Sequence, residues 1–157
     1  MKNMNEIFNF ISNINPPTKN EKSTITVYSR KAGRRVPIVN PAYKQVWELI
    51  HNEMYLTKFG ISKQAFKLLQ PKKRAAIEKE LTERNIVVSL WNGFHRMDAG
   101  NFWDELIDRL QGIAFKNDRQ VKEYHVYKDD NCKVEYFKVI VEEQDYPVEK
   151  RFKDKAK

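Results

Sequence analysis

The sequence is poor in cysteine and glycine and has no long apolar run, and each shortage excludes a class of protein. The single cysteine, Cys132, excludes a scaffold held by disulfide bonds and is typical of a reducing compartment. The five glycines are scattered, so the sequence lacks a glycine-rich loop that would cradle a phosphate. No apolar stretch approaches the roughly 18 residues that span a membrane, and the N-terminus lacks the apolar core of a signal peptide. We therefore expect a cytoplasmic protein with no membrane partner.

The residues that are present predict a single basic domain. The chain has 157 residues, of which 41% are hydrophobic and 12% aromatic, enough to build one core. Its 29 Lys and Arg outnumber 21 Asp and Glu, which gives a formal net charge of +8. This balance favours a polyanionic partner because basic side chains displace counterions from phosphates, although a basic surface also serves solubility alone. We expect one domain over residues 1–145, with a basic helical insertion near 58–84, and a basic tail over 146–157.

The order of apolar patterns, prolines and turn residues predicts an α+β fold. The β-branched run over residues 85–91 (NIVVSLW) is typical of a buried central strand. Asn40 and Pro41 are typical of a helix start, and Ser62 is a candidate cap for the next helix. The expected helices cover residues 41–57, 62–70, 72–84 and 101–110, with Gly112 as the cap of the last one. The expected strands cover residues 6–14, 24–28, 35–39, 85–91, 120–128 and 133–142, with a turn at residues 129–131 joining the last two. This order predicts a mixed β-sheet covered by helices.

Zinc and thiol chemistry have little support in the sequence. His51, His95, His125 and Cys132 show no paired spacing of the kind that zinc sites use. A nucleophilic pair of Cys132 and His125 is conceivable, but it rests on no motif.

Four aspartates are better placed for chemistry. Asp98 follows the expected central strand by a short loop, and Asp118 lies just before the next strand. Asp104 and Asp108 are four residues apart, so they share one face of the intervening helix. Two carboxylates about 5 Å apart repel by roughly 3 kcal/mol at an effective dielectric of about 20, so a cluster at one end of the sheet would bind a cation such as Mg²⁺. An aspartate near a helix start is, however, also typical of a cap, and Asp104 with Asp108 is typical of a solvated face.

The stretch from His95 to Val121 (HRMDAGNFWDELIDRLQGIAFKNDRQV) resembles the signature of RusA-type Holliday junction resolvases. In that family an Asp-x-Asp-Asn-x-x-Lys motif opens a helix that ends in Asp-x-Leu, and an Asp-Asp pair follows a short loop. Residues 9–20 (NFISNINPPTKN) resemble the family's first strand and its Pro-Pro-Ser-x-Asn turn. Residues 40–50 (NPAYKQVWELI) resemble its first helix, which has an early Tyr. The resemblance covers roughly residues 6–50 and 85–142.

The resemblance implies a RusA-like fold and a homodimer that cuts a four-way DNA junction in two symmetric strands with Mg²⁺, or Mn²⁺ in its place. It assigns Asp98 to the first aspartate of the motif and Asp118 to the second member of the Asp-Asp pair, both of them catalytic metal ligands. Asn101 takes the place of the motif asparagine, and Asp108 that of the aspartate at the helix end. Proteins of this type act in DNA recombination and repair, and phages and prophages often encode them.

Three positions depart from the family pattern. Gly100 stands where the motif has its second aspartate, and Asn117 replaces the first aspartate of the pair. Asp104 stands in place of the catalytic lysine, and it is our candidate to replace the missing carboxylate as a third catalytic metal ligand. A cation would then have to come from another side chain, for which the candidates are Arg96, Lys116 and Lys122.

Basic residues that could contact DNA phosphates fall into three groups, and two alternatives to a nuclease stay open. The candidates are Arg30, Lys31, Arg34 and Arg35; Lys72, Lys73 and Arg74; and Arg96 and Lys116. The first alternative is a catalytically decayed RusA-like protein that binds branched DNA or a protein partner without cutting. The second is an unrelated basic α+β protein that binds RNA.

Overall fold

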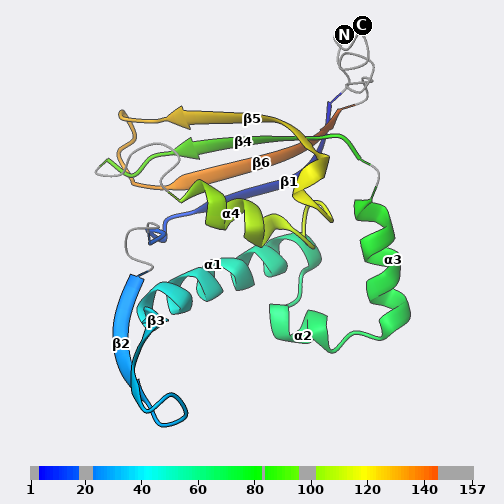
Figure 1. Cartoon of the computed structure of the whole chain (residues 1–157). Helices are drawn as coiled ribbons and strands as arrows, with labels where there is room; N and C mark the ends of the chain where they lie inside the picture. Colours follow the sequence, from blue (N-terminus) through cyan, green and yellow to red (C-terminus); the bar gives the residue numbers. More distant parts are fainter. Residues whose placement is uncertain (1–3, 18–22, 83, 96–101, 145–157) are drawn as a thin grey trace, which may run out of the picture.

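The chain adopts an α+β fold in which a four-stranded mixed sheet carries helices on one face (Figure 1). The computed structural model describes residues 4–17, 23–82, 84–95 and 102–144. In spatial order the strands of this sheet are β1 (Met4–Ser12), β6 (Phe137–Gln144), β4 (Ile86–Asn92) and β5 (Val121–Lys128). β4 pairs parallel with β5, whereas β6 pairs antiparallel with both β4 and β1. Within the described residues, no helix combines the length and the apolar character needed to cross a membrane.

The expected hairpin of the last two strands is wrong, because β4 lies between them. The chain leaves β4, crosses through α4 (Trp103–Leu110) and the 3-10 helix η2 (Asp118–Gln120), and returns as β5 beside β4. β6 then pairs with the other side of β4. This arrangement gives β4 a hydrogen-bonded neighbour on each side, which agrees with the burial of six of its seven residues.

Three further helices follow the predicted order: α1 (Pro41–Phe59), α2 (Lys63–Lys67) and α3 (Pro71–Leu81). Two of the predicted caps are confirmed. The Asn40 side chain accepts a hydrogen bond from the Ala42 N–H at 3.0 Å, and Ser62 Oγ accepts one from the Ala65 N–H at 3.1 Å. The predicted cap of α4 is not Gly112, which lies with a φ of 86° one residue beyond the actual cap, Gln111.

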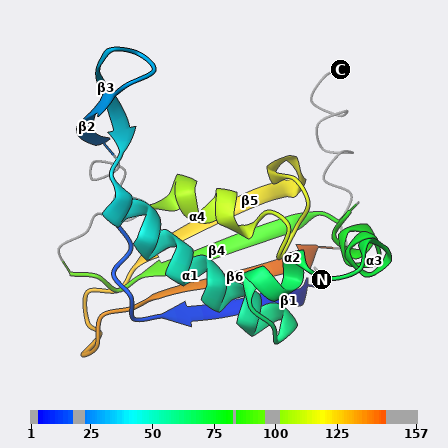
Figure 2. The same ribbon diagram turned by 90° about the horizontal axis from the view of Figure 1, so that it is seen from below.

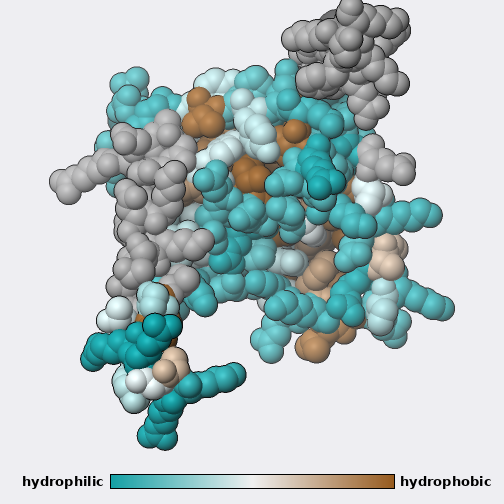
Figure 3. All heavy atoms as spheres, in the orientation of Figure 1, coloured by the Kyte–Doolittle hydropathy of each residue, from teal (hydrophilic) through white to brown (hydrophobic). Residues whose placement is uncertain are grey.

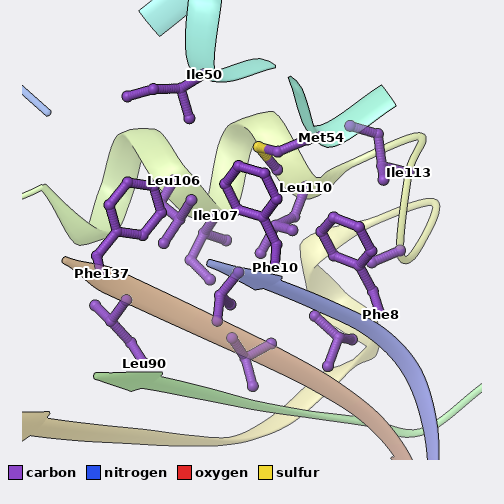
Figure 4. Packing of buried hydrophobic residues seen from close by; sticks show 14 of the residues in the cluster. Phe8, Phe10, Ile50, Met54, Leu90, Leu106, Ile107, Leu110, Ile113 and Phe137 are labelled. Atoms are coloured by element: carbon purple, nitrogen blue, oxygen red, sulfur yellow. The ribbon is translucent and has the colours of Figure 1, made fainter. Parts of the chain in front are cut away.

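The hydrophobic core lies between the sheet and the pair α1 and α4 (Figures 1 and 2). Alternate residues of each strand point toward the helices, since successive side chains of a strand face opposite ways. Figure 4 shows Phe10 and Phe137 of the sheet facing Leu106 and Ile107 of α4. Trp47 of α1 is fully buried, and its ring nitrogen donates to the Pro17 carbonyl at 3.2 Å. This bond ties α1 to the segment that follows β1.

A second sheet, formed by β2 (Ser23–Ser29) and β3 (Arg34–Val39), projects from the body as a hairpin (Figures 1 and 2). We call residues 23–39 the basic arm. Its two strands pair antiparallel, and Gly33 takes a φ of 64° in the turn between them. The prediction of two short strands over residues 24–28 and 35–39 is therefore confirmed.

Candidate functional site

The structure describes two of the three predicted catalytic aspartates, Asp118 and Asp104. Asp98 lies outside the described residues, as do Asn101, Arg96 and the predicted tail over 146–157. Asp118 is the first residue of η2, and its side chain is exposed.

The position of Asp118 is set by hydrogen bonds around η2. Asn117 caps this short helix, because its side chain accepts from the Arg119 N–H at 2.9 Å. The Gln120 side-chain oxygen accepts from the Asn117 N–H at 3.0 Å, and its amide nitrogen donates to the Leu81 carbonyl at 2.7 Å. These bonds fix the backbone of η2 against the end of α3 and leave the Asp118 carboxylate facing solvent.

Two aromatic residues that sequence reasoning missed connect Asp118 with the first turn of α4. The ring of Tyr124, on β5, contacts the ring of Trp103 edge-on, with 5.4 Å between the ring centroids. Burial raises the pKa of Tyr124, and the negative charge of Asp118 raises it further, so this carboxylate lies near the phenol. Trp103 directly precedes Asp104. No motif could have identified Tyr124, because its role depends on β5 lying under α4.

Asp104 and Asp108 occupy the outer face of α4. Both side chains are exposed, whereas Leu106, Ile107 and Leu110 are buried on the side that faces the sheet. Among the described residues, no three His, Cys, Asp or Glu side chains lie close enough together to hold a metal ion. Asp104 and Asp118 therefore do not form a magnesium site by themselves, and an ion bound there would need a ligand from the rest of the chain.

Strand pairing places Asp118 toward the end of the sheet at which β4 begins. β4 and β5 run in the same direction, pairing Ile86 with Val121 and Asn92 with Lys128. Asp118 lies three residues before Val121, so it is close to the start of β4. The expectation that Asp98 and Asp118 meet at one end of the sheet stays a prediction, because Asp98 lies outside the described residues.

A polar cluster that sequence reasoning also missed covers the end of β4. The Cys132 thiol lies 3.3 Å from His95 Nε2 and donates to the Gly93 carbonyl at 3.2 Å. The sequence suggested His125 as a partner of Cys132, but His125 lies on β5. His95 and Cys132 are 37 positions apart, so no local spacing could have paired them.

The connection between β5 and β6 is held by a hydrogen bond between a tyrosine and a carboxylate. Tyr136 donates its hydroxyl proton to Asp129 Oδ2 at 2.7 Å. This bond raises the pKa of Tyr136 to about 12 and lowers the pKa of Asp129. The His95 N–H donates to Glu135 Oε1 at 3.0 Å. Residues 129–136 are thus fastened over the point where the chain enters the motif segment.

The predicted DNA-contacting residues that are described are exposed, with the exception of Arg74. Arg30, Lys31, Arg34 and Arg35 are all exposed at the tip of the basic arm. Figure 3 shows that the surface of the arm is largely hydrophilic. In α3, Lys72 and Lys73 are exposed and Arg74 is partly buried, while Lys116 is exposed just before η2. The arm is the group that extends farthest from the body of the protein (Figure 1).

An ionic network joins α4 to α1. Its charged side chains pair with one another. Arg109 bonds Glu48 at 2.6 Å and Glu105 at 3.0 Å. Burial opposes the charge on Glu48, yet hydrogen bonds from Lys63 and Arg109 lower its pKa to about 2. Burial lowers the pKa of the neighbouring His51 to about 4. The network holds α4, and with it Asp104, in a fixed position on α1.

Comparisons with known proteins do not assign this chain to a family. No family model matches this chain, and no curated protein matches it. Among solved structures, a similarity is found to 2C-methyl-D-erythritol 2,4-cyclodiphosphate synthase from Plasmodium vivax, with 10% sequence identity and a TM-score of 0.33, covering 91% of this chain and 93% of that one. A similarity at this level supports no argument about function.

Proposed function

We propose that the chain is a metal-dependent, structure-selective endonuclease that resolves four-way DNA junctions by hydrolysing phosphodiester bonds. The observation that carries the proposal is the spacing of the aspartate motif on one strand–helix–strand unit. β4 precedes the motif, α4 includes its helical part, and η2 presents Asp118 just before β5. In RusA-type resolvases, which this motif resembles, the same order of elements carries the nuclease site.

The basic arm supports DNA as the partner. Four cationic side chains at its tip are exposed on a hairpin that stands away from the body. Cations placed in this way follow phosphates without reading base sequence, which suits an enzyme that selects a branched structure. An exposed two-stranded ribbon is also an element that fits into a groove of duplex DNA.

The metal is assigned by the resemblance rather than by a described contact. Mg²⁺, or Mn²⁺ in its place, would be held by Asp98 and Asp118, with Asp104 as the third candidate. A metal ion in such a site activates water and stabilises charge on a phosphodiester. Asp118 contributes an exposed carboxylate on a backbone fixed by Asn117 and Gln120.

Single substitutions of the two motif aspartates test the proposal. We expect Asp98→Asn and Asp118→Asn to reduce cleavage of a labelled four-way junction by about 100-fold or more, the scale of losing one group that stabilises a transition state. Junction binding should persist, because neither residue belongs to the basic arm. Asp130→Asn is the matched control, since Asp130 is an exposed aspartate outside the motif. Cleavage by Asp98→Asn at the wild-type rate would refute the assignment.

The second candidate is a RusA-like protein that binds branched DNA, or a protein partner, without cutting. It is favoured by the exposure of Asp104 and by the absence of a three-carboxylate group among the described residues. Restoring the family pattern with Gly100→Asp and Asp104→Lys should then create cleavage in an inert chain. A double variant that stays inert while it still binds metal and junctions would count against this candidate.

A further inference from the structure

The basic arm carries an exposed aromatic side chain, Tyr28, close to its tip. Tyr28 lies on β2, two residues before Arg30, and it is 65% exposed. Tyr124 and Tyr127 are the other exposed tyrosines among the described residues, and each of them contacts another ring. No ring pair or cation–π contact within the described part of the chain includes Tyr28. Its ring therefore has a face available to a ligand.

Hydrogen bonds in the turn of the basic arm fix the backbone directly after Tyr28. The Gly33 N–H donates to the Ser29 carbonyl at 2.8 Å, and the Ala32 N–H donates to Ser29 Oγ at 3.2 Å. Tyr28 is five residues from the start of β2, a distance of about 17 Å at about 3.3 Å per residue. The ring is thus held near the end of the arm that projects from the body (Figures 1 and 2).

Strand register places Tyr28 beside the cations of the basic arm. Tyr28 pairs directly with Arg35, and Ser29 pairs with Arg34. Residues directly opposite each other in an antiparallel pair share a face, so Tyr28 and Arg35 lie on the same face of the arm. Arg35 Nη1 donates to the Thr26 carbonyl at 3.4 Å, so its guanidinium lies along β2 toward the body. The arm contains four Lys and Arg and no Asp or Glu, so its charge is complementary to a polyanion.

An exposed ring among cations fits a nucleic acid that presents an unstacked base. Cations contact phosphates, whereas a ring face contacts the face of a base. In a linear duplex each base is already stacked on its neighbours, so a ring can enter only by forcing two base pairs apart. The stack is interrupted at the branch point of a junction, so a base there can be reached at a lower cost of unstacking. The chemistry of the arm therefore favours branched DNA over an uninterrupted duplex.

We infer that Tyr28 stacks on a base at the branch point of a DNA junction while the cations of the basic arm bind the phosphates beside it. The inference rests on the proposed function, because it takes branched DNA as the substrate, and it adds a residue and a contact that the proposal does not contain. In this arrangement Tyr28 selects the branched structure. The phosphate contacts of the arm supply affinity for any DNA.

Photocrosslinking of the full chain to a four-way junction tests the contact directly. Iodouracil, which crosslinks to an aromatic ring stacked on it, is placed either at the branch point or inside one duplex away from the branch. The reactions contain EDTA so that no strand is cut. We expect a crosslink at Tyr28 from the branch-point position, identified by mass spectrometry, and none from the duplex position. Tyr28→Leu removes the ring and should abolish this crosslink.

Fluorescence anisotropy in the same buffer measures how much the ring contributes to binding. We expect Tyr28→Leu to weaken junction binding about tenfold, the scale of removing one ring from a stacked base, and to leave binding to a linear duplex within about twofold of the wild type. Tyr28→Phe keeps the ring and should bind the junction as the wild type does. Tyr127→Leu is the matched control, since Tyr127 is an exposed tyrosine of β5, outside the arm. Thermal melting of each variant checks folding.

The possible results separate this inference from the nuclease proposal. Junction binding that Tyr28→Leu leaves unchanged would overturn the inference, leave the nuclease proposal standing and leave the ring free for a protein partner. An equally strong crosslink from a linear duplex would also overturn it. A junction that crosslinks to Tyr28 but is not cut when Mg²⁺ is added would support the inference and contradict the nuclease. No junction binding by the wild type would contradict both.

Discussion

At the scale of single residues, Gly93 is constrained by the tyrosine that packs on it. A Cβ atom at this position would lie 2.6 Å from Tyr136 Cδ1 and 2.7 Å from Cε1, closer than real contacts allow. We expect Gly93→Ala to lower the free energy of unfolding by about 1–3 kcal/mol, the usual cost of overpacking. Chemical denaturation measures this loss. The same substitution should cost less in a Tyr136→Ser background, and an equal cost in both backgrounds would contradict the steric account.

His51 should make the free energy of unfolding depend on pH, over a range different from that of its neighbour Glu48. Burial, with help from Lys63 and Arg109, lowers its pKa from 6.5 to about 4. The unfolded chain therefore binds a proton before the folded chain does, so this stabilisation is complete above about pH 6.5 and is lost as the pH falls toward 4. Glu48, whose pKa falls from 4.5 to about 2, loses its contribution only below about pH 4.5.

We accordingly predict that the free energy of unfolding falls between pH 6.5 and 4.5 and that His51→Leu flattens this fall. The full shift would be worth about 3 kcal/mol at most, since one pKa unit is about 1.4 kcal/mol. Urea denaturation at several pH values provides the measurement, with His125→Leu as the control, because His125 is an exposed histidine of β5. A slope that His51→Leu leaves unchanged would assign the effect to other groups.

Sequence reasoning could predict individual residues of the site only where a local pattern marks them. Asp118 was predicted because it lies at a fixed distance from Asp98 in a motif, and the structure places it, exposed, before a strand. Trp103 and Tyr124 were not predicted, because their contact depends on how α4 lies over β5. The bond between His95 and Cys132 was missed for the same reason.

At the scale of elements, local signals predicted most helices and strands but not which strands pair. Asn40 and Pro41 begin α1 as expected, and the apolar run of β4 is buried as expected. The hairpin expected of β5 and β6 was wrong because a polar turn such as residues 129–131 suits a longer connection as well as a tight one. The order of strands is decided by tertiary packing, which no local window contains.

The basic arm is the element whose removal should affect DNA binding most. We expect Arg30→Gln, Lys31→Gln, Arg34→Gln and Arg35→Gln together to weaken junction binding and to flatten its log–log salt slope by about 3 to 4, since each phosphate contact contributes about 0.9. Fluorescence anisotropy over a salt series measures both quantities. The melting temperature should not change, because all four side chains are exposed.

Lys72→Gln with Lys73→Gln provides the comparison from α3, where both side chains are also exposed. If this pair alone flattened the slope while the arm variant did not, the DNA surface would lie on α3. An unchanged slope in both variants would contradict phosphate binding by either element.

At the scale of the whole molecule, the structure separates three surfaces. The basic arm projects at one end, the first turn of α4 and Asp118 lie on the helical side, and the face of the main sheet that carries no described helix lies on the other side (Figures 1 and 2). We therefore expect that DNA binding and cleavage can be lost one at a time.

The most direct test of the central proposal is cleavage of a labelled four-way junction by the wild-type chain, compared with a linear duplex of the same sequence. We predict paired nicks in the junction alone, in the presence of Mg²⁺ or Mn²⁺, and none with EDTA. Tight, salt-sensitive junction binding without a nick at any metal concentration would contradict the endonuclease and leave a DNA-binding protein.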